Sequence, residues 1–199
     1  MRAGVLGWLA AGMLAGPMVA NAVGILDQSQ QDGTSGEINS QSNVLVWQQG
    51  VTAGMSGLLA QVDLYVAGVS PGNFYFEVNP GAPWQTDAPA FSTLLSPAPS
   101  AGWISVDVSS AGINLTAGQV FALNIRGNGP STDCCGLGRG ARNNPYAGGS
   151  LWFNNDGTRF ADTDLAFRTY VQQAPEPGTL ALFGLGLAGL GLSRRRRTH

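Results

Sequence analysis

The chain has 199 residues, enough for one domain of ordinary size with short appendages. Only 11% of its residues are charged, against about 25% in a typical soluble domain, and its 29 glycines and 11 prolines indicate frequent turns. Lysine is absent, and residues 23–173 contain five arginines and eleven carboxylates. A domain with this net negative charge does not attract a polyanion, so the composition predicts no nucleic-acid partner.

The first 22 residues have the three parts of a secretory signal peptide. Arg2 supplies the positive start, residues 3–15 form an apolar segment, and Pro17 ends it because proline cannot continue a helix. Ala20 and Ala22 are the small residues that signal peptidase needs, so we expect cleavage after Ala22 and export of the remainder. The alternative is a retained N-terminal membrane anchor.

Residues 23–173 form the predicted exported domain. Apolar and polar residues alternate in several short segments separated by Gly, Pro, Asn and Asp, which is typical of strands and turns. The pattern predicts an all-β fold, an antiparallel β-sandwich of seven or eight strands. The side chains expected to face its core are Val62, Leu64, Val66, Phe74, Phe76, Val78, Ile104, Val106, Val108, Phe121, Leu123, Ile125, Leu165, Phe167 and Val171, and those expected outside include Asp164, Arg168 and Tyr170.

Three segments carry a resemblance to a known fold: VTAGMSGLLAQVDLYV from Val51, LTAGQVFALNI from Leu115 and DLAFRTYV from Asp164. Together they resemble secreted jelly-roll domains of the galactose-binding-like type. The resemblance implies a jelly-roll sandwich of the kind found on bacterial surface proteins, where it sometimes serves as a carbohydrate-binding module.

The Gly-rich segment 127–150 is expected to be a long loop, and it contains the only two cysteines, Cys134 and Cys135. In an oxidising compartment they could form a disulfide between neighbours, remain free thiols or bridge to another chain. The planar and aromatic groups of this segment suit a sugar ligand, and exposed tryptophans could add further sugar contacts. The alternative is a surface loop without a ligand. The candidate glycan contacts are Arg139, Arg142, Tyr146, Trp84 and Trp103.

The sequence offers little catalytic chemistry. Its only histidine is His199 at the end of the tail, which excludes the common histidine-dependent hydrolase sites and zinc sites from the exported domain. We therefore predict that the protein is not an enzyme, although a pair of carboxylates could still form a glycosidase site. No cofactor is expected except calcium, for which Asp156, Asp162 and Asp164 are the candidate ligands, and the same residues also suit a hairpin turn.

The last 26 residues, 174–199, combine three features in order: Pro175, Glu176 and Pro177; an apolar segment at 179–192; and four arginines at 194–197. As a helix the apolar segment is only about 20 Å long, short for a bilayer core of about 30 Å. The arginines favour the cytoplasmic side, so the domain before them would lie outside. These features predict a short C-terminal transmembrane helix.

This tail resembles the PEP-CTERM protein-sorting signal. The resemblance implies recognition by exosortase, a membrane enzyme thought to cleave near the triplet, in a Gram-negative bacterium that makes exopolysaccharide. A simple tail anchor is the alternative. The resemblance to the sorting signal also implies an inner-membrane-anchored precursor, and a processed protein that reaches the cell surface or extracellular matrix.

The sequence thus favours an exported, non-enzymatic surface or matrix protein with a structural or exopolysaccharide-associated role. The alternative is a carbohydrate-binding module whose ligand site lies in the 127–150 loop.

The two terminal signals make a testable prediction about processing. The mature surface protein should begin at Val23 and lack the arginines at 194–197, because both ends are targeting elements, and intact-mass spectrometry measures this directly. Changing those four arginines to glutamate should abolish surface display, because their charge sets the cytoplasmic side. Unchanged display of that variant would contradict the predicted topology.

Overall fold

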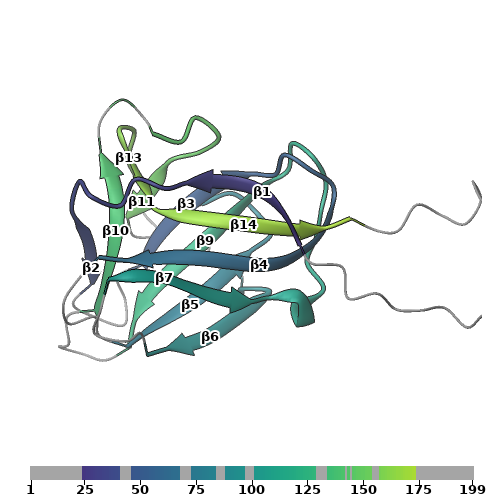
Figure 1. Cartoon of the computed structure of the whole chain (residues 1–199), viewed down its shortest axis with the longest axis horizontal. Helices are drawn as coiled ribbons and strands as arrows, with labels where there is room; N and C mark the ends of the chain where they lie inside the picture. Colours follow the sequence, from purple (N-terminus) through teal and green to yellow (C-terminus); the bar gives the residue numbers. More distant parts are fainter. Residues whose placement is uncertain are drawn as a thin grey trace, which may run out of the picture.

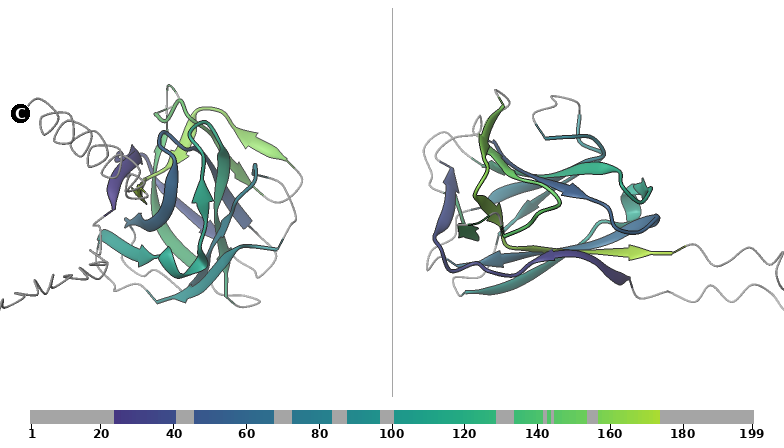
Figure 2. Two further views of the ribbon diagram at one scale, coloured as in Figure 1. Left: turned by 90° about the vertical axis from the view of Figure 1, so that its right-hand side faces the viewer. Right: turned by 90° about the horizontal axis from the view of Figure 1, so that it is seen from above.

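The computed structural model describes residues 24–40, 46–67, 73–83, 88–96, 101–128, 134–141, 143, 145–153 and 157–173. Two antiparallel sheets pack against each other around one apolar core (Figures 1 and 2). This arrangement confirms the predicted all-β sandwich. The predicted signal peptide and sorting tail lie outside the described residues, and within the described part no helix is long and apolar enough to cross a membrane.

The first sheet has the central order β1-β14-β4-β7; β10 pairs with the last residue of β4 and carries β2 and β13, and β8 pairs with the first residues of β4. Its strands are β1 (Ile25–Gln30), β14 (Phe167–Gln172), β4 (Gly57–Val66), β7 (Gly102–Asp107), β8 (Asn114–Leu115), β10 (Cys134–Ala141), β2 (Glu37–Ser40) and β13 (Thr163–Leu165). A short 3-10 helix, η1 (Ser109–Ala111), follows β7.

The second sheet has the order β12-β11-β3-β9-β5-β6. Its strands are β12 (Thr158–Phe160), β11 (Leu151–Phe153), β3 (Val46–Thr52), β9 (Val120–Gly127), β5 (Phe74–Asn79) and β6 (Phe91–Leu95). Along the chain, β1, β4, β7 and β14 belong to the first sheet, while β3, β5, β6 and β9 belong to the second. The chain therefore crosses repeatedly between the sheets, as in Greek-key sandwiches.

The core contains the apolar side chains that the alternating pattern placed there. Of the fifteen, fourteen are buried and Ile104 packs against the core while partly exposed. Burial of Phe74, Phe76, Phe121 and Phe167 is complete, which removes a large apolar area from water and supplies the main driving force for folding.

Asp164 is a correction, because its side chain was expected outside and is fully buried. The predicted single strand is two strands: β13 ends at Leu165, β14 begins at Phe167, and β13 pairs with β10. The face of β13 that carries Asp164 is covered by Gln49 of β3 and by the backbone of Tyr146. Alternation along one strand does not reveal such a covering segment.

The Gly-rich segment is a second correction, since it contains strand β10 where a loop was expected. A Cβ at Gly138 would lie 2.7 Å from the carbonyl oxygen of Gly33, and one at Gly140 would lie 3.0 Å from that of Asp32. Glycine is depleted in strands in general, but here it permits close contact between β10 and the chain that precedes β2.

Both ends of the described domain lie at the same end of the sandwich (Figures 1 and 2). Ile25 at the start of β1 pairs with Val171 near the end of β14. The sorting tail and the predicted signal peptide therefore both adjoin one end of the domain, and strands β10 and β13 lie at the other end (Figure 1).

The packing predicts that truncating two different leucines to alanine has very different effects on stability. Leu123→Ala should lower the free energy of unfolding by about 2–5 kcal/mol, because it leaves a cavity in a fully buried site. The matched control is Leu94→Ala on β6, whose side chain is 45% exposed and whose loss should change stability by about 0.5 kcal/mol or less. Urea denaturation measures both, and equal losses would contradict the assigned core.

Candidate functional site

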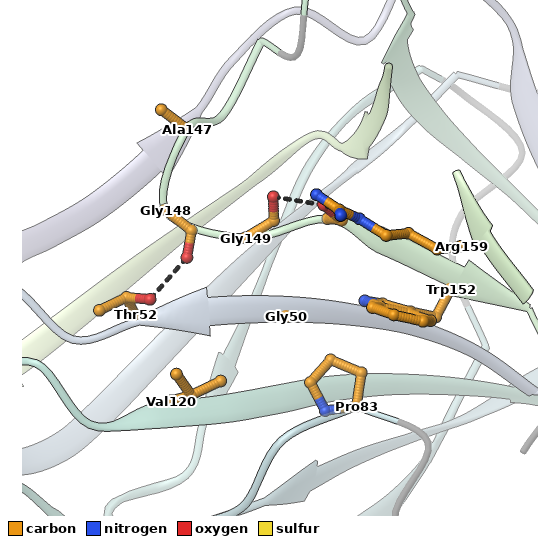
Figure 3. A pocket seen from close by; sticks show the side chains of 10 residues that line it. Gly50, Thr52, Pro83, Val120, Ala147, Gly148, Gly149, Trp152 and Arg159 are labelled. Atoms are coloured by element: carbon orange, nitrogen blue, oxygen red, sulfur yellow. Dashed lines mark hydrogen bonds between the residues drawn. The ribbon is translucent and has the colours of Figure 1, made fainter. Parts of the chain in front are cut away.

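A cleft of about 310 Å³ lies over β3 in the second sheet (Figure 3). This volume is at the lower end of the range for small-ligand sites. The cleft is bounded on one side by the segment that leads into β11 and on the other by residues beside β5 and β9. Its lining residues are Gly50, Thr52, Pro83, Val120, Ala147, Gly148, Gly149, Ser150, Trp152 and Arg159.

Two glycines allow the wall of the cleft to approach β3. A Cβ at Gly149 would collide with the carbonyl oxygen of Gly50, and a Cβ at Gly50 would lie 2.8 Å from Cγ of Pro83. The backbone N–H of Gly50 donates a hydrogen bond of 2.9 Å to the carbonyl oxygen of Ser150. Glycine at 149 permits this backbone contact, and glycine at 50 leaves room for the Pro83 ring.

Three side-chain hydrogen bonds then fix the wall in place (Figure 3). Thr52 Oγ1 donates to the carbonyl oxygen of Gly148 at 2.6 Å, and Ser150 Oγ donates to that of Gly149 at 2.7 Å. Arg159 Nε donates to Ser150 Oγ at 3.0 Å. The wall of the cleft is therefore formed before any ligand binds.

Trp152 and Arg159 occupy one end of the cleft, on paired positions of β11 and β12. The guanidinium carbon of Arg159 lies 6.0 Å from the centroid of the Trp152 ring. Among the described residues, Arg126 forms an ion pair with Glu77 at 2.6 Å and Arg168 one with Asp63 at 3.9 Å, whereas Arg159 has no carboxylate within ion-pair distance. Among the described residues that line the cleft, Arg159 alone is charged.

A buried polar network supports the wall from behind. Asp164 Oδ1 accepts a 2.9 Å hydrogen bond from Gln49 Nε2, and Oδ2 accepts one of 3.1 Å from the Tyr146 backbone N–H. Gln49 Oε1 accepts from the backbone N–H of Leu165 at 2.8 Å. Burial raises the pKa of the Asp164 carboxyl above its ordinary value, and the hydrogen bonds from Gln49 and Tyr146 and the charge of Arg159 oppose this rise only in part.

Tyr146 anchors the same segment and is a correction to its predicted role as a glycan contact. Its side chain is only 7% exposed, and its ring packs edge-on against Phe167 at 5.1 Å. Its hydroxyl donates to Gln28 Oε1 at 3.1 Å, and burial raises the pKa of Tyr146 to about 12. Tyr146 therefore holds the segment to the core and presents no aromatic face to a ligand.

The other described glycan candidates do not meet at the cleft. Arg139 on β10 lines a different cavity of about 140 Å³, together with Glu37 and Trp47. Trp103 lies on β7 in the first sheet, where the guanidinium of Arg168 covers its ring at 3.9 Å. The residues grouped by sequence are thus divided among three places in the fold.

Several predicted site residues lie outside the residues or side chains that the structure describes. They are Ala20, Ala22, Trp84, Cys134, Cys135, Arg142, Asp156, Pro175, Glu176 and Pro177. Of the calcium candidates, Asp162 is exposed and Asp164 is buried with both oxygens accepting N–H donors. In the described part of the chain no three Asp, Glu, His or Cys side chains are grouped so that they could hold a metal ion.

Sequence reasoning missed Arg159, and it preferred Trp84 and Trp103 to Trp152 as the tryptophans that would contact a sugar. The available signal was the sequence Asn-Asp-Gly at 155–157, because this sequence favours a hairpin, and a hairpin there would place the two residues opposite each other, as they are in the pairing of β11 with β12. Pro83, Thr52 and Val120 carried no signal, since they reach the cleft from distant parts of the chain.

Comparison with known proteins identifies the tail alone. Residues 173–197 match the family described as the PEP-CTERM protein-sorting motif, which confirms the predicted sorting signal. The motif indicates an exported protein that exosortase processes from a membrane-anchored precursor. No curated protein and no solved structure matches the chain.

The buried network predicts a pH-dependent effect of Asp164→Asn. The variant should lose about 1–3 kcal/mol of unfolding free energy, because its amide NH2 replaces one of the two acceptor oxygens and faces the N–H donor of either Gln49 or Tyr146. The pKa of Asp164 is raised in the folded state. The stability that the Asp164 side chain contributes is therefore fully present below the ordinary carboxyl pKa of 3.8, and it declines as pH rises through the pKa of the folded state.

The stability gap between the native protein and Asp164→Asn should therefore be largest at low pH and narrow as pH rises. Denaturation curves at several pH values measure it, with Asp162→Asn, an exposed neighbour, as the control that should show no gap. A gap that widens with pH would show that the buried carboxylate is stabilised rather than penalised.

Proposed function

We propose that this protein is a non-enzymatic component of the cell surface or extracellular matrix of a Gram-negative bacterium and associates there with exopolysaccharide. The observation that carries the proposal is the sorting motif at 173–197. Signal peptidase and exosortase would act on the precursor, and the sandwich would be the part that remains outside. Exopolysaccharide is the proposed partner of that sandwich.

The position of the chain ends supports this arrangement. Gly24 and Gln173 bound the described domain at one end of the sandwich, next to the pairing of β1 with β14. A precursor held by its tail would keep that end towards the membrane. The sides of both sheets, with the cleft over β3 on one of them, would then be accessible to the matrix.

The buried carboxylates support a non-enzymatic role because each has structural partners. Glu77 accepts a 2.6 Å hydrogen bond from Arg126 Nη2. Asp63 Oδ2 accepts one from the Tyr170 hydroxyl at 2.9 Å, and Asp164 accepts two from N–H groups. None of these three carboxylates lines the cleft. Groups committed in this way stabilise the domain and are poorly placed to transfer protons to a substrate.

A carbohydrate-binding module is the second candidate function, and one observation favours it. Residues 148–150, at the end of the predicted 127–150 ligand segment, form a fixed wall of the cleft beside Trp152. The strand orders β1-β14-β4-β7 and β3-β9-β5-β6 also support the jelly-roll resemblance, because each sheet then holds four strands of two Greek keys.

Exopolysaccharide association can be tested in cells. The processed protein should stay in the matrix fraction of cells that make exopolysaccharide and should appear in the medium when polysaccharide export is blocked. The control replaces residues 23–173 with an unrelated secreted domain between the same signal peptide and tail, and its distribution should not depend on polysaccharide. A distribution of the natural protein that ignores polysaccharide would contradict the proposal.

A further inference from the structure

We propose that the cleft over β3 binds an acidic sugar unit, with the sugar ring against Trp152 and its carboxylate on Arg159. This inference rests on the carbohydrate-binding function proposed above and specifies the chemical class of its ligand. It concerns one sugar unit or a chain end, since the cleft of about 310 Å³ is too small to enclose a long chain.

The apolar part of the cleft suits a sugar ring. Trp152 supplies a half-buried indole, and Pro83 and Val120 add aliphatic surface on the opposite side of β3 (Figure 3). Val120 is 40% exposed, which is unusual for a large apolar side chain of this domain. A pyranose has an apolar face of C–H groups and a rim of hydroxyls, so it can cover the aromatic surface and keep its polar rim in water.

The polar part of the cleft favours a negative charge. Arg159 is the one charged residue in the described lining, and its Nε is held by Ser150 Oγ at 3.0 Å, which orients the guanidinium. The two Nη atoms have no hydrogen bond to a described residue and match the two oxygens of a carboxylate. The other described lining residues are neutral, so none of them repels a carboxylate.

The charge of the whole domain limits how the ligand binds. Five arginines against eleven carboxylates between the targeting ends give a net negative body that repels a polyanion at long range. A single carboxylate on Arg159 needs only one local cation and avoids most of this repulsion. The prepared wall at 148–150 reduces the entropy lost on binding, because three hydrogen bonds already order it.

The test compares ligands that differ only in their carboxylates. Tetrasaccharides of glucuronate, galacturonate, mannuronate and guluronate, each paired with its carboxyl-reduced form, are titrated into the full chain in mild detergent by calorimetry. At least one acidic tetrasaccharide should bind about tenfold more tightly than its reduced form, because only the acid can form charged hydrogen bonds with Arg159.

Variants then locate the site. Arg159→Gln should remove the tenfold preference and leave binding of the reduced form unchanged, while Trp152→Ala should weaken both forms. Trp103→Ala in the first sheet is the matched control, since it removes a half-exposed tryptophan away from the cleft and should change neither affinity. Thermal unfolding of each variant shows whether the fold is retained, and Arg159→Lys, which keeps the charge but loses the paired donors, should recover part of the preference.

Each of the other possible results would overturn one specific claim. Equal, Trp152-dependent binding of acidic and reduced forms would overturn the inference and leave saccharide binding intact. Binding that depends on Trp103 would move the site to the first sheet. Competition by a glutamate-rich peptide as strong as that by uronate would replace the saccharide with an acidic peptide, and no binding of any saccharide would overturn the carbohydrate-binding function as well.

Discussion

The contact between the backbones of Gly149 and Gly50 is the constraint on which the candidate site depends. No side chain fits between these two segments, so residues 147–150 lie directly on β3 and leave a cleft between themselves and Pro83. The hydrogen bond from Gly50 N–H to Ser150 closes the contact. The shape of the cleft thus follows from the absence of a Cβ at two positions.

Buried polar groups hold the same segment from the other side. Asp164, Gln49 and Tyr146 satisfy one another and neighbouring backbone groups, which makes their burial tolerable in an otherwise apolar interior. Removing one partner leaves a donor or acceptor without a substitute, so these residues fix the position of residues 145–150. The Asp164 carboxylate holds this segment through its hydrogen bonds. Its desolvation costs free energy and raises its pKa.

Charge is distributed so that most described arginines serve the domain itself. Arg126 pairs with Glu77 and stacks over Tyr75 at 4.3 Å, and Arg168 contacts Trp103 and Asp63. Arg159 differs, because its hydrogen bond goes to Ser150 in the wall of the cleft. The domain has few charges and a net negative charge, so Arg159 gives the cleft a local positive charge that is opposite in sign to the charge of the domain.

The sequence by itself determined the features that are encoded locally. Alternation along each strand identified the inward residues Val62, Leu64 and Val66, because successive side chains of a strand point to opposite faces. The sorting motif was also legible, since it is a linear signal whose parts are adjacent in the chain. A sandwich followed from several such strands separated by turns.

Only the tertiary structure decided what lies against each strand. Asp164 and Tyr146 were expected to be accessible and are buried, because β3 and β14 cover them from distant parts of the sequence. Strand β10 escaped notice because its glycines indicate a turn by composition and form a strand through pairing with β2 and β13. The cleft unites Thr52, Pro83 and Arg159, and their meeting depends on sheet order and backbone contact, which no local pattern of side chains records.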